Sequence, residues 1–294
     1  MTGESGVTVG LVGAGEMGAA VGAALLAAGH RVLTDLSARS GETRTRAIEA
    51  GLIDRPLAGI AAEAAIIFSI VPPSVAEATG AAVAEAAGAA GDTRLIFVEA
   101  NAISPDLSRA IAAGFGPSVS VVDGGIIGMP PVGDARPRLY LSGPRPAGLV
   151  EVASSAFDVR HLGADYGAAS AMKMVYASVT KGFNALLTGA FVLAERLDLG
   201  DAFADEMAAS QAQHFRRAET MVAALPADAG RWVREMEEIR DTYEAADLPG
   251  GFNQAAADIY RLLDSSPYGT ETRRTRDRRR TLRATVATLA AQVK

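Results

Sequence analysis

One lysine in this sequence has the residue type and the surroundings that acid–base chemistry requires. Lys173 is the first charged residue in an apolar segment that begins at Ala168. Its neighbours include Met172, Met174 and Tyr176. Burial lowers the pKa of a lysine and prepares its amine to exchange protons near neutral pH. The pattern predicts Lys173 as a general acid or base, with a solvated helix lysine as the ordinary alternative.

Three glycines near the start of the chain predict a site for a dinucleotide. Gly13, Gly15 and Gly18 follow a short apolar strand and open an alanine-rich helix. In that order the glycines allow a tight turn, a close approach of backbone to a pyrophosphate, and close packing of helix on strand. The phosphates would contact the N–H groups at the helix start, where Glu16 and Met17 are also predicted to bind cofactor.

The second predicted strand, over 31–35, ends where such proteins contact the adenosine ribose. An acid at that position favours NAD. Asp35 is expected to point away, because the count from the glycines places the cofactor-facing residue near Leu36 and strand neighbours face opposite sides. The following loop offers two hydroxyls and a guanidinium: Ser37, Ser40 and Arg39. This set suits a 2′-phosphate, so NADP is the expected cofactor and NAD the alternative.

The order of predicted elements indicates an α/β fold. Apolar strands are predicted at 65–71, 94–98, 119–123, 139–142 and 159–162, with helical segments between the earlier ones. This alternation predicts a Rossmann-type, doubly wound parallel sheet that binds ligands at the carboxyl ends of its strands. Only helical periodicity follows Asp165. We therefore expect an NAD(P)-binding domain over 1–163 and an all-helical substrate and dimerisation domain over 164–294.

The predicted strand ends supply further candidates for ligand contact. Val71, Pro72 and Asn101 are expected beside a nicotinamide. After Asp123 the sequence is rich in glycine and proline over 124–131. Such a segment predicts backbone that closely approaches another group, with a plain long loop as the alternative.

Composition excludes several classes of function. The chain has 294 residues, a formal net charge of −6 and no cysteine, and its three histidines are far apart. Disulfides, thiolate metal sites and a nucleic-acid partner held by phosphate contacts are therefore not expected, and no metal is predicted. The first residues lack a signal-peptide pattern, and no apolar run approaches the ~20 residues of a membrane span. A cytoplasmic protein with no membrane partner is expected.

Taken together, these motifs resemble the β-hydroxyacid dehydrogenase family, which includes 3-hydroxyisobutyrate dehydrogenase and 6-phosphogluconate dehydrogenase. The resemblance covers nearly the whole chain. The family's glycine-rich substrate motif is similar to 123–129, and its lysine motif is similar to 167–177, with Lys173 at the catalytic position. The segment 231–239 resembles a poorly characterised branch with its own C-terminal domain. The implied substrate-binding residues are Asp123, Gly124, Gly125, Ile127, Tyr176, Ala177 and Arg234.

Departures from the family pattern bear on the substrate. Ile127 stands where the family has a substrate-binding serine, and Ala177 where it has an asparagine. Two polar anchors worth about 0.5 to 3 kcal/mol each are lost, which favours a substrate other than a simple small hydroxy acid. The retained lysine favours carbonyl and alcohol chemistry.

The resemblance implies an NAD(P)-dependent oxidoreductase that moves a hydride between nicotinamide and a small-molecule carbonyl or hydroxyl carbon. It also implies a homodimer that pairs through the helical domain. Two alternatives stay open: an imine or enamine reductase on the same scaffold, and a non-catalytic NADP-binding sensor.

Overall fold

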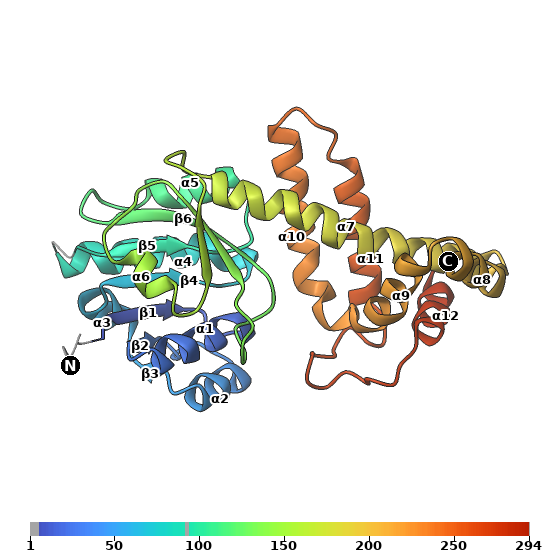
Figure 1. The fold of residues 1–294 in the computed structure, drawn as a ribbon, viewed down its shortest axis with the longest axis horizontal. Coiled ribbons are helices and arrows are strands. Elements are labelled where there is room, and N and C mark those ends of the chain that lie inside the picture. Colours follow the sequence, from blue (N-terminus) through green and yellow to red (C-terminus); the bar gives the residue numbers. More distant parts are fainter. Residues whose placement is uncertain (1–5, 92–93, 294) are drawn as a thin grey trace. The chain divides into compact units, whose positions relative to one another are not determined.

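The computed structural model describes residues 6–91 and 94–293, and the chain divides into two compact units, 1–174 and 175–294 (Figure 1). The sequence placed the boundary after residue 163. The units divide instead inside a long helix, α7 (Ala168–Arg196). The division falls later than predicted because the first turn of α7 is hydrogen-bonded to a strand of the N-terminal unit.

The N-terminal unit is built on one mostly parallel sheet. Its strand order is β3-β2-β1-β4-β5-β6-β7-β8. The strands are β1 (Thr8–Val12), β2 (Arg31–Thr34), β3 (Ile53–Asp54), β4 (Ile66–Ser69), β5 (Ile96–Glu99), β6 (Ser120–Ile127), β7 (Arg138–Ser142) and β8 (Asp158–His161). The predicted doubly wound sheet is confirmed.

Two features of the sheet differ from the expectation. The strand β3 was not predicted, because two residues are too few to give a periodic pattern. The strand β7 runs antiparallel to β6, whereas a wholly parallel sheet was expected. The connection over 128–137 contains no crossover helix, and a direct connection returns the chain antiparallel.

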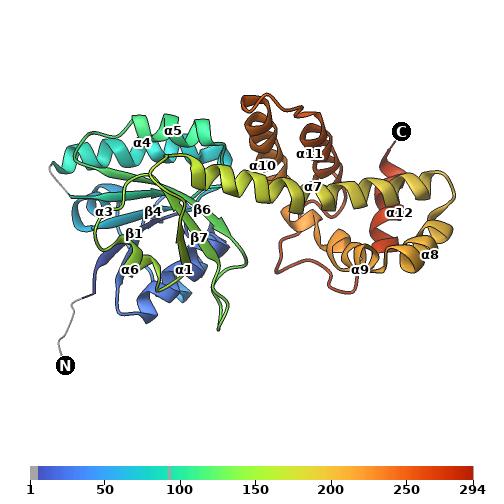
Figure 2. The same cartoon turned by 45° about the horizontal axis from the view of Figure 1, so that its top comes forward.

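Helices flank the sheet and make up the described part of the second unit (Figure 2). Those of the first unit are α1 (Glu16–Ala27), α2 (Gly41–Glu49), α3 (Leu57–Glu63), α4 (Pro73–Ala90), α5 (Pro105–Ala113) and α6 (Leu149–Ala153), followed by the start of α7. Those of the second unit, after the rest of α7, are α8 (Gly200–Ser210), α9 (Ala212–Met221), the 3₁₀ turn η1 (Val222–Ala224), α10 (Pro226–Ala245), α11 (Gly251–Asp264) and α12 (Leu282–Gln292). No strand occurs in residues 175–293, as the helical periodicity predicts.

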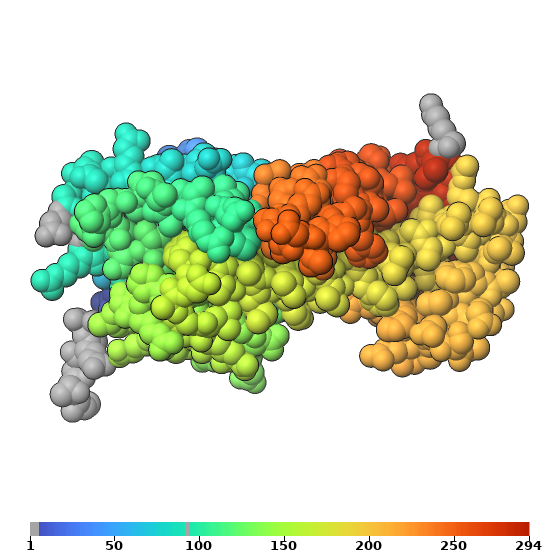
Figure 3. All heavy atoms as spheres, turned by 90° about the horizontal axis from the view of Figure 1, so that it is seen from above, coloured from blue at the N-terminus to red at the C-terminus, as the bar shows by residue number. Residues whose placement is uncertain are grey.

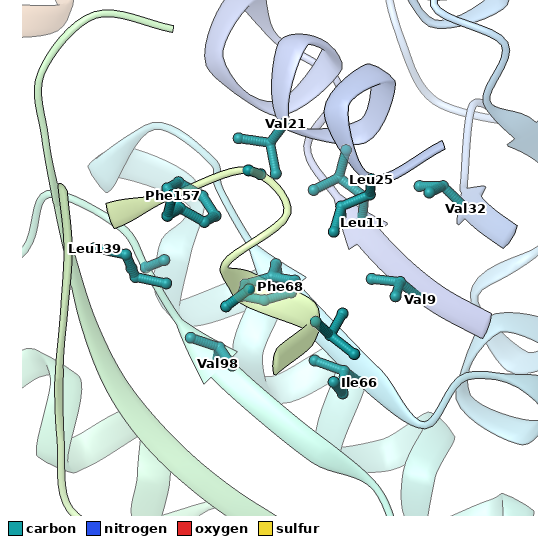
Figure 4. Packing of buried hydrophobic residues seen from close by; sticks show 14 of the residues in the cluster. Val9, Leu11, Val21, Leu25, Val32, Ile66, Phe68, Val98, Leu139 and Phe157 are labelled. Carbon is teal, nitrogen blue, oxygen red and sulfur yellow. The ribbon is translucent and has the colours of Figure 1, made fainter. Parts of the chain in front are cut away.

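Each face of the sheet has its own hydrophobic core, because successive side chains of a strand point to opposite faces. On one face, Leu11 and Phe68 pack with Val21 and Leu25 of α1 and with Phe157, which follows α6 (Figure 4). On the other face a second cluster joins the sheet to α3, α4 and α5. Burial on both faces explains why the central strands are continuous apolar runs in the sequence.

The strand β6 runs through two of the glycines that the sequence analysis placed after the strand, in a segment expected to approach another group closely. Gly124 and Gly125 lie inside the strand, which continues to Ile127. A Cβ atom on Gly125 would lie 2.5 Å from the carbonyl oxygen of Ala169 in α7. The backbone therefore does approach another group closely, and that group is a helix of the same unit.

The start of α7 is held by the carboxylate of Asp123 in β6. This carboxylate is fully buried, and its Oδ2 accepts hydrogen bonds from the backbone N–H groups of Ala169 and Ser170, each at 2.9 Å. The hydroxyls of Ser108 and Ser142 donate to it at 3.0 and 2.8 Å. The N–H groups at a helix start have no partner within the helix, and a negative charge there is favourable. Asp123 therefore fixes the position at which α7 begins.

The helix α7 is apolar enough to cross a membrane by length and composition, contrary to the expectation that no apolar run comes near that length. Its most apolar stretch of 18 residues has a mean hydropathy of 1.2. Of that stretch, 61% is buried inside the protein. Such burial is typical of the core helix of a globular protein.

The second unit has a buried ion pair at its centre. Lys181 of α7 pairs with Glu235 of α10, and both side chains are almost inaccessible to solvent. The Lys181 ammonium lies 5.4 Å from the centroid of the Trp232 ring, and Tyr260 of α11 donates a hydrogen bond to the Lys181 carbonyl at 2.8 Å. These contacts join α7, α10 and α11.

We predict that Asp123→Ala destabilises the N-terminal unit by roughly 2 to 4 kcal/mol, because it removes a helix cap and leaves several buried donors without an acceptor. Asp123→Asn keeps one acceptor oxygen, so it should lose less stability than Asp123→Ala. Urea unfolding followed by circular dichroism measures both. The matched control is Asp134→Ala in an exposed loop, which should change stability by less than about 0.5 kcal/mol. Equal losses in Asp123→Ala and the control would refute the capping role.

Candidate active site

The glycine turn after β1 has the geometry that a pyrophosphate site needs. Gly13 has a φ of +104°, and a Cβ atom on it would lie 2.3 Å from the carbonyl oxygen of Ile70. A Cβ atom on Gly18 would lie 1.9 Å from the Gly13 carbonyl oxygen, so helix and turn are in close contact. Gly13 and Gly18 are therefore required by the fold itself.

Gly15 differs from the other two glycines. A Cβ atom built on it meets no described atom within 4 Å, so the fold alone leaves room for a side chain there. Gly15 is also the N-cap residue of α1, and no side chain caps that helix. Open space beside uncapped N–H groups at a helix start is the cradle that a phosphate fills. The turn therefore fits the pyrophosphate of a dinucleotide; of its two neighbours, Glu16 is exposed and Met17 half-buried.

A pocket of about 230 Å³ lies next to this turn, at the carboxyl ends of β1 and β2. Its lining residues are Val12, Asp35, Ser37, Ala38, Arg39, Leu57, Val75, Ala78, Thr79 and Ala82. The expectation that Asp35 points away from the cofactor is wrong, because Asp35 lines the pocket and Leu36 is buried in the core. A mixed apolar and charged pocket at this position fits an adenosine moiety.

The carboxylate of Asp35 is an anchor for the loop after β2. Its Oδ1 accepts hydrogen bonds from the backbone N–H and the hydroxyl of Ser37, at 2.9 and 2.6 Å, and its Oδ2 accepts one from the Leu57 N–H at 2.9 Å. Burial opposes ionisation, but these hydrogen bonds outweigh it and lower the pKa of Asp35. The ionised carboxylate thereby holds the loop against the start of α3.

The expected three-residue cradle for a 2′-phosphate is reduced to one residue. The hydroxyl of Ser37 donates its proton to Asp35, and the hydroxyl of Ser40, the N-cap of α2, donates its proton to Thr43 Oγ1 at 3.1 Å while it accepts from the Thr43 N–H at 3.3 Å. Neither hydroxyl is therefore available as a phosphate donor. Among the described residues none accepts a side-chain hydrogen bond from Arg39, which lines the pocket and acts electrostatically on Asp35. Its guanidinium is the group in this pocket suited to a phosphate.

The sequence analysis expects Asn101 beside a nicotinamide, but in the structure its side chain is hydrogen-bonded within the protein. Asn101 is buried, its Oδ1 accepts from the Val71 N–H at 2.6 Å, and its Nδ2 donates to the Ser69 hydroxyl at 2.9 Å. These bonds tie the loop after β5 to the loop after β4. Val71 is also nearly buried, whereas Pro72 is exposed at the start of α4. Of the three residues, Pro72 alone is left with an exposed surface.

Lys173 lies beside the carboxyl end of β6. Its Nζ donates a hydrogen bond to the carbonyl oxygen of Ile126 at 2.7 Å, and its Cβ lies 3.2 Å from the point where a Gly125 Cβ would be. The side chain is half-buried, and its helix neighbours Met172 and Tyr176 are partly exposed, so the fully dry environment expected from the sequence is not present. The ammonium is positioned by the Ile126 carbonyl at the ligand-binding edge of the sheet.

The remaining predicted substrate residues are divided between the two units. The carboxylate of Asp123 caps α7, so its acceptor positions are already used. Gly124, Gly125 and Ile127 are buried in β6, and Ile127 is 2% exposed. The others belong to the second unit and are Tyr176, Ala177 and Arg234. Ala177 is buried, and Tyr176 is about half exposed. Arg234 forms ion pairs with Glu237 and Glu238 of its own helix, at 3.2 and 2.7 Å.

The sequence analysis did not single out Glu99, a buried carboxyl group at the end of β5. It is fully inaccessible, its Oε1 accepts a hydrogen bond from the Asn101 N–H at 2.9 Å, and among the described residues its Oε2 has no partner. Burial raises the pKa of Glu99 to about 8, and the charge of Asp123 on the neighbouring strand adds to the shift. The sequence feature that could have identified Glu99 is an acidic residue directly at the end of a continuous apolar strand.

We predict that Glu99 makes the N-terminal unit less stable as pH rises from about 4.5 to 8, because the folded state keeps a proton that the unfolded chain releases. Glu99→Gln removes this dependence and should be more stable than wild type at pH 8, by on the order of 3 kcal/mol, with the gap closing toward pH 5. Thermal or urea unfolding at several pH values measures the gap. Glu77→Gln on the exposed surface of α4 is the control. Parallel pH curves for wild type and Glu99→Gln would contradict the prediction.

Two segments of the chain match known sequence families. Residues 8–90 match the family described as NADP oxidoreductase coenzyme F420-dependent, and residues 194–263 match a domain of unknown function, DUF1932. No curated protein gives a significant match to the sequence. The first match covers the glycine turn, the residues that line the neighbouring pocket and the loop after β4.

Solved structures share the fold over nearly all of the chain. A conserved hypothetical protein from Sinorhizobium meliloti 1021 is 24% identical, with a TM-score of 0.68, over 98% of this chain and 97% of that one. Mycobacterium tuberculosis 3-hydroxyisobutyrate dehydrogenase, solved with L-serine, is 20% identical, with a TM-score of 0.66, over 97% and 99%. A Streptomyces aurantiacus imine reductase is 19% identical, with a TM-score of 0.55, over 91% and 97%.

The chain therefore carries a segment that matches the NADP oxidoreductase family and a segment that matches DUF1932, and it has the fold of a solved 3-hydroxyisobutyrate dehydrogenase and a solved imine reductase.

Proposed function

We propose that this protein is an NAD(P)-dependent oxidoreductase that acts on a carbonyl or hydroxyl carbon of a small molecule, with Lys173 as the general acid or base. The observation that carries the proposal is the position of the Lys173 ammonium, 2.7 Å from the Ile126 carbonyl oxygen at the end of β6. The glycine turn follows β1 at the same edge of the sheet, because β1, β4, β5 and β6 are parallel. A proton donor and a dinucleotide cradle thus share one ligand-binding edge.

The nicotinamide, when bound, supplies or accepts the hydride. The residues of this chain hold the cofactor and manage the proton. Gly15 and the start of α1 would bind the pyrophosphate, and Pro72 would border the nicotinamide. Lys173 would donate a proton from Nζ to the carbonyl oxygen, or accept it from the hydroxyl in the reverse direction. The Ile126 carbonyl keeps the Nζ atom at that position during either step.

NADP is the proposed cofactor because Arg39 lines the adenosine pocket with hydrogen-bond donors that a phosphate can accept. The competing group is Asp35, which lines the same pocket. Both acceptor positions of its Oδ1 and one of its Oδ2 are already used within the protein, so it is less suited to a ribose hydroxyl.

The proposed substrate is bulkier or less polar than a small hydroxy acid. Ile127 and Ala177 stand at the positions of the expected polar anchors, and both side chains are buried and apolar. Loss of these anchors also permits an imine substrate, which is the second candidate. The retained Lys173 favours the carbonyl reaction, because an oxyanion that forms as hydride arrives requires a proton.

We predict that Lys173→Ala lowers turnover by about 10² to 10⁴-fold with little change in cofactor affinity, because Lys173 acts on the substrate oxygen. The assay is NADPH oxidation against a panel of aldehydes, ketones, semialdehydes and cyclic imines, with NADPH affinity from nicotinamide fluorescence. Near-normal turnover in Lys173→Ala would overturn its role. Turnover of cyclic imines alone would favour the imine reductase. Tight cofactor binding with no turnover of any compound would favour a non-catalytic sensor.

We predict that Arg39→Ala weakens NADPH binding by about 10- to 100-fold and changes NADH binding less than twofold, because the lost contact is to the 2′-phosphate. Fluorescence titration with both cofactors measures the effect. Arg46→Ala is the matched control, since Arg46 pairs with Glu42 on α2 and does not line the pocket. Preference for NADH that Arg39→Ala leaves unchanged would assign the ribose contact to Asp35 and NAD as the cofactor.

A further inference from the structure

A second pocket of the first unit lies outside the proposed cofactor site and has no role in the function proposed above. Its volume is about 170 Å³. It is bounded by the last turn of α1, by the connection between β6 and β7, and by the residues that follow α6. The lining residues are Ala24, Pro131, Gly133, Ala135, Arg136, Ser155 and Ala156. None of them lines the pocket beside the glycine turn, so the two pockets are separate.

Arg136 supplies the positive charge of this pocket. Its Nη1 donates hydrogen bonds to the carbonyl oxygens of Ser154 and Ser155, at 2.8 and 3.2 Å. Ser154 is the C-cap of α6, so these bonds hold the guanidinium at the end of that helix. Among the residues that the structure describes, the Nε and Nη2 atoms of Arg136 have no acceptor. The side chain is therefore anchored through one nitrogen and keeps two others for a ligand.

Ser155 lines the same pocket, and the direction of its hydroxyl proton follows from His30. The backbone N–H of Val7 can only donate, so His30 Nδ1 is the acceptor of the hydrogen bond between them, at 3.3 Å. The His30 ring must then carry its proton on Nε2, which lies 3.3 Å from Ser155 Oγ. The ring donates to the hydroxyl oxygen, and the hydroxyl proton needs a different acceptor. The described part of the chain supplies none.

The same arrangement excludes Ser155 as a nucleophile activated by His30. A general base must accept the hydroxyl proton, and the Nε2 atom of His30 already carries one. What the pair offers is a hydrogen-bond donor. Together with Arg136 it gives a pocket whose described lining has one positive charge, a free hydroxyl proton and no carboxylate. A pocket of this composition favours an anion.

We propose that this pocket binds a phosphate group, free or carried by a small molecule, with the Arg136 guanidinium and the Ser155 hydroxyl as its donors. The fork formed by Nε–H and Nη2–H matches two oxygens of a phosphate, and the Ser155 O–H supplies a further donor. The pocket is several times larger than the ~30 Å³ that one water occupies in the liquid, so part of a phosphorylated molecule also has room.

The pocket is open to a ligand from solvent, because Gly133, Ala135 and Arg136 are exposed. In the space-filling view, green parts of the chain, the colour range of these residues, form part of the surface of the first unit (Figure 3). A phosphate in the pocket would join the connection between β6 and β7 to the residues that follow α6. Binding should therefore be detectable at both segments.

The test is a titration of the whole protein with inorganic phosphate, followed by the proton–nitrogen NMR signals of the Gly133 and Ser155 amides. Both signals should shift with one dissociation constant. Arg136→Gln keeps a donor for the α6 carbonyls but removes the charge, so phosphate should bind about 10- to 100-fold more weakly. Ser155→Ala should weaken binding by about 3- to 10-fold. The matched control is Arg145→Ala, an exposed arginine outside the pocket, which should bind phosphate like wild type.

The glycine turn can also accept phosphate, and Arg39→Ala separates the two sites. The Gly133 and Ser155 signals should respond in Arg39→Ala as they do in wild type. The proposal is overturned if phosphate leaves these two signals unchanged, if Arg136→Gln binds as tightly as wild type, or if acetate binds as tightly as phosphate. Glycerol phosphate distinguishes the sources of the group. Tighter binding than inorganic phosphate would support a phosphorylated molecule as the ligand, and weaker binding would support free phosphate.

Discussion

One buried carboxylate determines how the site is assembled. Asp123 in β6 accepts the N–H groups of Ala169 and Ser170, so α7 can begin at only one place relative to the sheet. Lys173 lies one turn further along the same helix and is therefore beside the Ile126 carbonyl. The missing side chain of Gly125 allows this contact, because any Cβ would clash with Ala169. The position of Lys173 therefore depends on both the Asp123 cap and the absence of a side chain at Gly125.

Most of the polar side chains at the strand ends form hydrogen bonds within the protein. Asn101 ties two loops together, Asp35 fixes the loop after β2, and burial raises the pKa of Glu99. What remains for ligands is largely backbone, together with the Arg39 guanidinium and the Lys173 ammonium. On the proposed function, this edge would hold the cofactor mainly by its shape and by helix N–H groups, and few polar side chains would recognise the substrate.

The α/β class, the helical second half and the glycine turn could be predicted from the sequence, because each depends on local patterns. Buried strands are continuous apolar runs, and the three glycines have steric roles that any chain would impose. The prediction failed where the pattern was too short, as in β3, or where direction depends on the connection, as in β7. The end of β6 was also missed, because Gly124 and Gly125 have no side chains and so cannot show the alternation of apolar and polar residues that indicates a strand.

By itself, then, the sequence determined that a glycine turn opens the first helix and that a lysine lies on an apolar helix. Only the tertiary structure decided which side chains face the ligand edge. It turned Asp35 into the pocket and Leu36 into the core, and it used Asp123 as a cap. The physical reason is that a buried polar group takes whichever partner folding brings near, and Asp123 and Ala169 are 46 residues apart.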